Sequence, residues 1–415
     1  MFQSFIGEKV VPLAGDMIYK DFGIDVETLR ELQLIQELEV IVNSAATTNF
    51  NEMYDVALNV NVMGVKHLCH FVKKCPNLEV LLHVSTAYVG GDKQGLVQER
   101  PFIYGETLRD GTHLDIDAEL RLANDLRKQM DASMDPTSAL LGPANTYVFI
   151  KSMGEMILSQ LLQDERDVPI VIIRPSIITS ILNDPLPGWI EGDRSIHTVV
   201  LSYVKENQTC FLADLGLTMD VVSNHNFHVI ERDDGCHGGA QLVLIRGDKV
   251  LYPSTPVVYH VSSSLRHPAS RGLLYEAGFR YLKEHPLAVP NGQAVRTHKM
   301  WFIGSIFSFR LFMVLRYLLS IEFLHLLSIL CCGFFGLDKL YQKLAHKYRS
   351  AMQIVDLYGS YALFKGCFED INLNKLRLAL PNDHGSLFNF DPKTIDWNDY
   401  FYRVHIPGVI KYMLN

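Results

Sequence analysis

The stretch that decides the fold is "LEVLLHVSTAYV", residues 78–89. Its apolar run has the length and composition of a strand that is buried on both faces of a sheet. A hydroxyl pair, Ser85 and Thr86, closes the run. We therefore start from a buried strand whose carboxyl end carries two polar side chains.

Similar runs lie on both sides of this strand, and helical patterns separate them. The strand-like runs are "VVPLAG" (10–15), "LEVIVNSAA" (38–46) and "VPIVIIRPS" (168–176). The helical patterns are residues 25–33, 52–74 and 115–130, followed by a helix that contains Tyr147. Strands that alternate with helices predict a parallel sheet covered on both faces. The fold class is α/β, with a Rossmann-like doubly wound parallel sheet.

Composition narrows the class of protein. The chain has 415 residues, which favours two domains. We expect residues 1–296 to form the Rossmann-like domain and residues 297–415 to form an apolar, mainly helical C-terminal domain. A net charge of −8 argues against a nucleic-acid partner. The seven cysteines are an odd number without a C-x-x-C pair, which argues against disulfides and zinc and favours a reducing compartment.

Residues 301–337 are the most apolar block of the chain. Arg310, Arg316, Glu322 and His325 interrupt it. A membrane span needs about 20 mostly apolar residues, and a charge near its centre is costly. Our preferred interpretation is that the block forms buried core helices. The alternatives are a helix that lies at a membrane surface and a true membrane span.

A tyrosine and a lysine stand four residues apart in "TYVFIKSMG", residues 146–154. On a helix, Tyr147 and Lys151 would lie on one face. A nearby ammonium favours the phenolate and lowers the pKa of a phenol, which suits general acid catalysis near neutral pH. Such a pair is also common on solvated helix faces, so by itself it is weak evidence for catalysis.

Other polar residues give the pair a context. Ser85 and Thr86 close one strand, and Asn61 lies within an otherwise apolar helical pattern. Ligands of open parallel sheets bind beyond the carboxyl ends of the strands. Separately these residues fit turn positions or a helix surface. Together and in this order, they favour a catalytic site.

The set resembles the extended type of the short-chain dehydrogenase/reductase superfamily. The resemblance implies that Thr86, or less favourably Ser85, and Tyr147 hold the substrate oxygen. It implies that Lys151 lowers the pKa of Tyr147 and binds the nicotinamide ribose, and that Asn61 supports a proton relay. The cofactor contacts that the resemblance implies are Asp16, Met17, Asn43, Ala45, Lys151, Pro175 and Ser176.

The plant-type fatty acyl-CoA reductase family is the closer resemblance, and it extends over nearly the whole chain. The similar motifs are "NSAATTNFNEMYDVALNVNVMG", "HVSTAYV", "TYVFIKSMGE", "IIRPSIITS", "PLPGWIEG" and "IDWNDYFYRVHIPG". The resemblance implies reduction of a long-chain acyl-CoA to a primary alcohol through the aldehyde, with NADPH, in wax and lipid metabolism. The alternatives are a truncated, non-catalytic remnant of the family and another extended short-chain dehydrogenase.

One element of a dinucleotide-binding fold is missing from the sequence. A glycine-rich turn between the first strand and helix normally receives the pyrophosphate, and residues 1–15 hold only Gly7 and Gly15. We therefore expect "VVPLAG" to be the third strand of a sheet that is incomplete at its N-terminus. Residues 1–15 should be loosely held or pair non-natively, the inner edge of strand 38–46 should be bare, and NADPH binding should be weak or lost.

Two further expectations concern metal binding and location. His225, His228, Cys236 and His237 match no ordinary zinc spacing, so we predict a surface loop and no metal. The first residues do not resemble a signal peptide. The family resemblance and the apolar block favour the cytosolic face of the endoplasmic reticulum membrane, with plastid or cytosol as alternatives.

Overall fold

The structure is a computed structural model. It describes residues 7–31, 34–50, 52–91, 93–106, 113–133, 146–161, 168–183, 186–192, 196–206, 209–223, 255–287, 297–330, 336–379 and 390–414. The chain divides into two compact units. The first comprises residues 1–91, 99–175 and 245–260, and the second comprises residues 92–98, 176–244 and 261–415. The domain boundary near residue 296 stays a prediction, because these units are defined by spatial contacts alone.

The first unit alternates helices and strands, as expected. Its strands are β1 (Val40–Asn43), β2 (Val80–Val84), β4 (Ile170–Pro175) and β9 (Val257–Val261), the last of which runs to the unit boundary. Its helices are η1 (Lys20–Gly23), α2 (Val26–Glu31), α3 (Leu34–Glu37), α4 (Tyr54–Leu58), η2 (Asn59–Met63), α5 (Gly64–Val72), η3 (Ala87–Gly90), α6 (Ile116–Ser133) and α7 (Thr146–Leu161). The Rossmann-like α/β class is confirmed.

The four strands form one sheet in the order β1-β2-β4-β9. The β1–β2 and β2–β4 pairs are parallel, with Asn43 opposite His83 and Val84 opposite Ile173. All three strands therefore end at the same edge of the sheet. Each strand is a short apolar run, and hydrogen bonds to β1, β4 and β9 satisfy the backbone of the inner strands β2 and β4.

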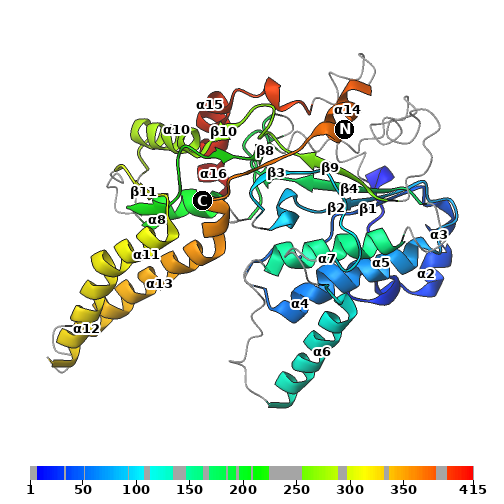
Figure 1. Ribbon diagram of the computed structural model, residues 1–415, viewed down its shortest axis with the longest axis horizontal. Helices are drawn as coiled ribbons and strands as arrows, with labels where there is room; N and C mark the ends of the chain where they lie inside the picture. Colours follow the sequence, from blue (N-terminus) through cyan, green and yellow to red (C-terminus); the bar gives the residue numbers. More distant parts are fainter. Residues whose placement is uncertain are drawn as a thin grey trace. The chain divides into compact units, whose positions relative to one another are not determined.

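Helices α4, α5 and α7 cover one face of this sheet (Figure 1). The core between them buries Leu81 and Ile172 of the sheet against Val65 of α5 and Met153 of α7. Gly154 allows the close approach, because a Cβ there would lie 3.0 Å from the carbonyl oxygen of Asn61. Packing thus places α7 directly over the strand ends that carry the site.

The expected strand at residues 10–15 is wrong. These residues are irregular in structure and exposed, with Val11 70% exposed and Val10 52% exposed. A strand forms only where a neighbour shares its backbone hydrogen bonds, and among the described residues β1 pairs with β2 alone. The edge of β1 that faces away from β2 is therefore unpaired within the described part of the chain.

The second unit is mainly helical with short two-stranded sheets. Its helices are α8 (Ile196–Glu206), α10 (Arg271–Glu284), α11 (Ile306–Met313), η5 (Val314–Leu318), α12 (Leu319–Leu330), α13 (Leu337–Ala362), α14 (Ile371–Ala379), η7 (Pro392–Thr394), α15 (Trp397–Asp399), η8 (Tyr400–His405) and α16 (Ile406–Met413). Its strands are β3 (Gly95–Val97), β5 (Ile177–Ile178), β6 (Cys210–Leu212), β7 (Thr218–Met219), β8 (Val221–Val222), β10 (Ala269–Ser270), β11 (Trp301–Ile303) and β12 (Gly366–Phe368). The mainly helical C-terminal part is confirmed.

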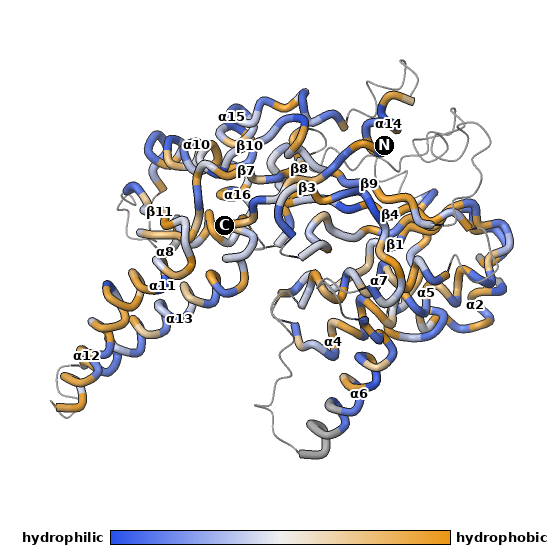
Figure 2. Tube along the Cα trace, in the orientation of Figure 1, coloured by the Kyte–Doolittle hydropathy of each residue, from blue (hydrophilic) through white to orange (hydrophobic). Residues whose placement is uncertain are grey.

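Helices α11, η5 and α12 form one continuous helix that packs beside α13 as a long arm, which is largely apolar along α11 and α12 (Figures 1 and 2). Stretch Ile306–Leu330 is long and apolar enough to cross a membrane, but only 17% of its most apolar window is buried. Our first expectation, buried core helices, is therefore wrong for this stretch. Among the described residues, the helix packs on one side, and large apolar side chains on its other side, such as Phe307, Leu315 and Phe323, are exposed.

Candidate active site

The ends of β1 and β2 hold four of the predicted site residues. Asn43 is the last residue of β1, and Ala45 follows in an irregular segment. Ser85 and Thr86 follow β2 and are buried. Parallel strands that end together bring these residues to one edge, which is where ligands of open α/β sheets bind.

Lys151 reaches this edge from α7. Its Nζ donates a hydrogen bond to the carbonyl oxygen of Val84, the last residue of β2, at 2.8 Å. The side chain is buried, and burial lowers the pKa of Lys151 to about 8, although the carboxylate of Glu155 opposes the shift. The sequence pattern did not reveal that this lysine is anchored to the strand that carries Ser85 and Thr86.

Tyr147 lies one helical turn before Lys151 on α7 and is partly buried. Residues four apart share a helix face, so both side chains point toward the same side of α7. The ring of Tyr147 packs against Phe50, with 5.2 Å between ring centroids. Phe50 belongs to the segment that follows β1, so Tyr147 contacts that segment.

Asn61 is buried in η2, a π-helical turn between α4 and α5. Its Oδ1 accepts from the N–H of Thr47 at 2.9 Å, and its Nδ2 donates to the carbonyl oxygen of Thr47 at 3.0 Å. π-helical turns in α-helices occur frequently at functional sites. Here the turn presents an amide that holds the segment after β1 through two hydrogen bonds.

The two hydroxyl candidates differ in their contacts. Oγ1 of Thr86 accepts from the N–H of Tyr88 at 3.3 Å and so caps η3. Ser85 donates its backbone N–H to Ile173 at 2.7 Å, while its Oγ has no hydrogen-bond partner among the described residues.

The other predicted cofactor residues are spread over several segments. Asp16 is exposed, and Oδ1 of Asp16 accepts from the N–H of Ile18 at 3.0 Å. The carbonyl oxygen of Met17 lies 3.1 Å from Nδ1 of His67 on α5. In the part of the chain that the structure describes, the side chain that bonds this turn, His67, belongs to α5 and not to the ends of β1 or β2.

Two predicted residues lie at the end of β4. Pro175 is its buried last residue. Ser176 opens the second unit, and its N–H donates to the carbonyl oxygen of Val261 at 3.0 Å. The chain therefore leaves the sheet at two residues that we predicted to contact the cofactor.

His83 is a residue that the sequence reasoning missed. Its Nδ1 lies 2.9 Å from Nδ2 of Asn43, and the imidazole is buried. Burial, with the charge of Lys151 as a smaller cause, holds the pKa of His83 well below its ordinary value. The sequence could have indicated this contact, because His83 lies within an apolar strand pattern and a buried polar side chain needs a hydrogen-bond partner.

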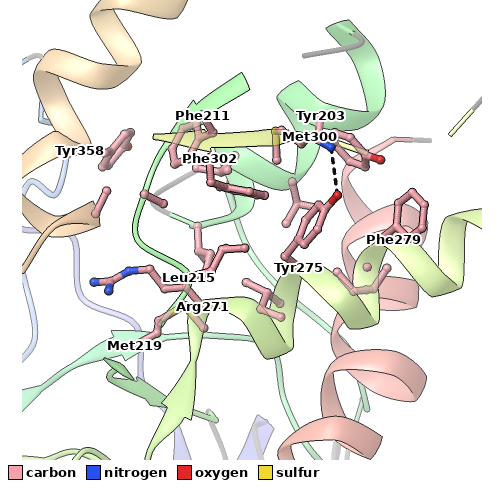
Figure 3. Close-up of a pocket in the computed structure, with 18 of the residues that line it drawn as sticks. Tyr203, Phe211, Leu215, Met219, Arg271, Tyr275, Phe279, Met300, Phe302 and Tyr358 are labelled. Atoms are coloured by element: carbon pink, nitrogen blue, oxygen red, sulfur yellow. Dashed lines mark hydrogen bonds between the residues drawn. The ribbon is translucent and has the colours of Figure 1, made fainter. Parts of the chain in front are cut away.

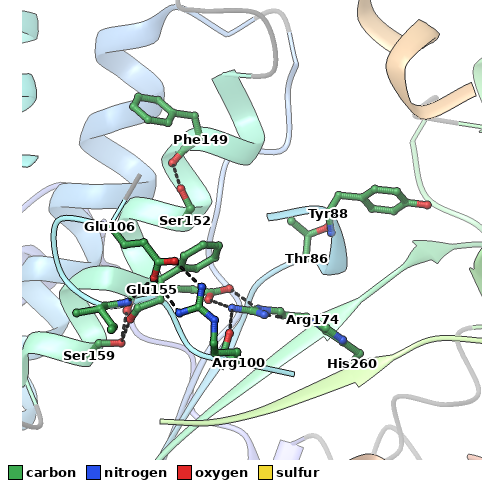
Figure 4. A network of polar contacts seen from close by, with 12 residues as sticks. Thr86, Tyr88, Arg100, Glu106, Phe149, Ser152, Glu155, Ser159, Arg174 and His260 are labelled. Carbon is green, nitrogen blue, oxygen red and sulfur yellow. Dashed lines mark hydrogen bonds and ion pairs between the residues drawn. The ribbon is translucent and has the colours of Figure 1, made fainter. Parts of the chain in front are cut away.

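A buried ion pair was missed as well. Nε of Arg174 donates to Oε1 of Glu155 at 3.0 Å, and Nη2 lies 2.5 Å from Oε2 (Figure 4). Nη2 also donates to the carbonyl oxygen of Arg100, and the guanidinium stacks over the ring of Phe102. The sequence did contain a signal for this ion pair. Glu155 lies in an apolar helical pattern and Arg174 lies in an apolar strand pattern, and buried charges are almost always paired.

No group of three or more His, Cys, Asp or Glu side chains that could hold a metal is found in the part of the chain that the structure describes. The segment with His225, His228, Cys236 and His237 lies outside the described residues. The arrangement at the strand ends contains an amine, a phenol and hydroxyls. Such groups can bind and protonate a carbonyl oxygen.

Comparison with known proteins agrees with this fold. A family model described as "Male sterility protein", the NAD-binding part, matches residues 1–227, and a second model with this description matches residues 316–415. Among solved structures, the terminal R domain from the myxalamid PKS-NRPS pathway has a TM-score of 0.52 at 13% identity, covering 99% of this chain and 77% of that chain. The fold and the NAD-binding match define the class: a protein with a Rossmann-like fold that binds a nicotinamide cofactor.

Similarity in sequence gives the particular family. The chain is 38% identical over 429 residues to "Probable fatty acyl-CoA reductase 4" of Arabidopsis thaliana, covering 99% of this chain and 84% of that protein. It is 34% identical over 430 residues to "Alcohol-forming fatty acyl-CoA reductase" of Simmondsia chinensis, covering 100% of this chain and 84% of that protein. The chain belongs to the fatty acyl-CoA reductase family, as its motifs predicted.

Proposed function

We propose that this chain reduces a long-chain fatty acyl-CoA to a primary alcohol with NADPH. The observation that carries the proposal is the anchoring of Lys151 to the end of β2, one helical turn from Tyr147 and next to the two hydroxyls. Family membership supports the acyl-CoA substrate, and the name of the Simmondsia relative supports the alcohol product. The choice of NADPH over NADH follows from the family resemblance.

The strand ends fit a nicotinamide cofactor. Ala45 is small and exposed at the end of β1, and Asn61 holds the segment that contains it. Oδ1 of Asn43 and Oγ of Ser85 are buried without hydrogen-bond partners among the described residues. Buried polar atoms without partners are costly, so a polar ligand at this edge would stabilise them. Asn43, Ala45, Lys151, Pro175 and Ser176 would hold the cofactor, with Asp16 and Met17 near its adenine.

The residues would act as follows. The cofactor supplies a hydride to the thioester carbon and, in a second round, to the aldehyde carbon. The hydroxyl of Thr86 and the phenol of Tyr147 donate hydrogen bonds to the developing oxyanion. As the carbonyl re-forms, the carbon–sulfur bond breaks and CoA leaves as the thiolate. After the second hydride, Tyr147 gives its proton to the alkoxide, and the charge of Lys151 favours the resulting phenolate.

One experiment tests the proposal directly. The chain is titrated with NADPH while nicotinamide fluorescence is followed, and stearoyl-CoA is then added and the alcohol is measured. Tyr147→Phe should lower the rate by about 10²–10⁴-fold, since it removes the proton donor. Thr86→Ser should retain more activity than Thr86→Val. Tyr341→Phe removes a phenol from α13 in the second unit and serves as the control.

The outcomes separate the alternatives. An active wild type with an active Tyr147→Phe variant would mean that the proton donor is another residue. Absence of both NADPH binding and alcohol would favour the non-catalytic remnant. Reduction of a nucleotide sugar or a sterol, and not of an acyl-CoA, would favour another extended short-chain dehydrogenase.

We also propose that the arm of α11, α12 and α13 lies at a membrane surface. Its apolar side exposes large side chains at spacings of three and four residues: Phe307, Leu311, Leu315, Leu319, Phe323, Leu326 and Leu330. On α13, Lys339, Lys343 and Lys347 are exposed one turn apart. An apolar face beside lysines suits the interface of a membrane with anionic lipids. We propose the cytosolic face of the endoplasmic reticulum, with plastid or cytosol as alternatives.

A further inference from the structure

The second unit contains an apolar cavity of about 150 Å³ that is partly open to solvent. Residues of α8, α10, β6 and β11 line it, together with the ends of α13 and α16 (Figure 3). Every lining residue that the structure describes belongs to the second unit, so the cavity is considered within that unit. Arg271 is the only charged residue among the lining residues that the structure describes.

Three polar side chains of the wall make hydrogen bonds to the protein itself. The hydroxyl of Tyr203 donates to the carbonyl oxygen of His298 at 2.6 Å. The hydroxyl of Tyr275 accepts from the N–H of Met300 at 3.0 Å, the bond drawn in Figure 3. Nη2 of Arg271 donates to the carbonyl oxygen of Tyr361 at 2.9 Å. Both tyrosines therefore offer the cavity mainly the carbon surface of their rings.

This chemistry selects the kind of ligand. A sugar or a nucleotide would bury hydroxyls against a wall with few groups to bond them, which costs free energy. A hydrocarbon chain loses no hydrogen bonds there and gains from leaving water. Cavities lined by apolar side chains stay dry and accept apolar ligands. The lining thus favours an aliphatic chain over the polar substrates of other extended short-chain enzymes.

Small residues leave space on two sides of the cavity. Gly278 lies on α10, and a Cβ built there would meet only the side chain of Ile406, at 3.4 Å and 3.9 Å. Ala362, the last residue of α13, lines the cavity from another element. Larger side chains at these two positions would reduce the length of chain that the cavity can hold.

We propose that this cavity binds the hydrocarbon chain of the acyl substrate and that Gly278 and Ala362 help to set the chain length accepted. The inference rests on the proposed function, which gives a long-chain acyl-CoA as the substrate. The inference predicts that substitutions in the cavity affect long and short acyl chains differently. Filling the cavity should penalise long chains and spare short ones, whereas damage to the fold would affect all chain lengths equally.

The first test compares Gly278→Leu and Ala362→Leu with the wild type on stearoyl-CoA and decanoyl-CoA. Each methylene that no longer fits should cost about fourfold in kcat/KM, so we expect a loss of about tenfold or more for stearoyl-CoA. The kcat/KM for decanoyl-CoA should change by less than about twofold. Glu276→Leu adds the same side chain to the exposed side of α10 and should leave both values unchanged. A parallel loss for both substrates in both cavity variants would overturn the inference.

The second test measures binding without catalysis. The fluorescent fatty acid cis-parinaric acid is titrated into the full chain and then displaced with stearate or decanoate. We expect each cavity variant to weaken cis-parinaric acid binding by about tenfold and Glu276→Leu to have no effect. If the wild type binds the fatty acid with this pattern but reduces no acyl-CoA, the proposed function fails and the cavity assignment stands. Unchanged binding in both folded variants, or no binding to the wild type, would overturn the assignment.

Discussion

Lys151 is a basic side chain held in an environment that penalises its charge. Burial lowers its pKa to about 8, and the carboxylate of Glu155 opposes the shift. Its carbonyl partner on Val84 compensates part of the lost hydration. A buried lysine is retained for a role, since an apolar residue would be cheaper to bury. In our proposal that role is to present an ammonium to a phenol and a cofactor.

The shifted pKa predicts a pH dependence of stability. The folded-state pKa of Lys151 lies near 8, below the 10.5 of an ordinary lysine. Between these values the unfolded chain binds more protons, so stability rises with pH in this window. Compared with Lys151→Met, the cofactor-free wild type should gain on the order of 1–3 kcal/mol from about pH 7 to about pH 10.

Urea unfolding at both pH values measures this difference. The comparison with Lys151→Met cancels most of the titration of other lysines and tyrosines. Parallel changes in the two proteins would show that the pKa of Lys151 is ordinary in the folded state.

At the scale of elements, buried polar contacts connect α7 to the sheet. Glu155 on α7 pairs with Arg174 on β4, and both side chains are at most 2% exposed. Lys151 bonds the end of β2 from the same helix. The helix that carries Tyr147 is thus fixed to two strands by specific bonds in addition to its apolar packing, which maintains its register over the strand ends.

Removing one partner of the Glu155–Arg174 ion pair should lower the free energy of unfolding more than replacing both partners with apolar residues. Glu155→Ala leaves the guanidinium of Arg174 buried with one partner fewer, so we expect a loss of about 3–5 kcal/mol in the free energy of unfolding. The double variant Glu155→Met with Arg174→Met removes both charges and should be more stable than Glu155→Ala. Denaturant unfolding of the single and double variants measures this coupling. Equal losses would mean that the pair carries no specific interaction.

The arm gives a second prediction at the element scale. Phe323→Glu with Leu326→Glu places two charges on the exposed apolar side of α12 and should strongly reduce co-sedimentation with vesicles that contain anionic lipid. Leu122→Glu changes an exposed leucine on α6 of the first unit and serves as the control. Vesicle binding that survives the double change would exclude this face as the membrane contact. A change in oligomeric state without vesicle binding would point to a second copy of the chain.

At the scale of the whole molecule, the two proposed ligands belong to different units. Most of the predicted cofactor residues lie in the first unit, whereas the apolar cavity is lined by the second alone. Ligand binding stabilises the state that binds it and slows the local opening that hydrogen exchange detects.

Hydrogen exchange with mass spectrometry can test this division. NADPH should slow exchange at residues 40–50 and 80–90, around the ends of β1 and β2. A non-hydrolysable stearoyl-CoA analogue should slow exchange in α8 and α10. Protection by the analogue that is confined to the first unit would contradict the placement of the acyl chain, although it would leave the proposed reaction untouched.

Much of the first unit could be predicted from local patterns. The apolar runs at residues 38–46, 78–89 and 168–176 became β1, β2 and β4, and the helical pattern at residues 52–74 became α4, η2 and α5. The position of the candidate residues at the ends of β1 and β2 could also be predicted, because parallel strands end at one edge of the sheet. The run at residues 10–15 had the same composition but did not form a strand, since a strand also needs a partner.

The sequence by itself determined the order of strands and helices, the family and the candidate chemical groups. These depend on residue types and on spacings along the chain, which neighbouring residues specify. Tertiary structure alone decided that Lys151 is anchored to Val84, that Glu155 meets Arg174, that the apolar arm is exposed, and that a cavity lies beside Gly278. Burial and pairing depend on residues far apart in the sequence, and a local pattern does not specify which of them meet.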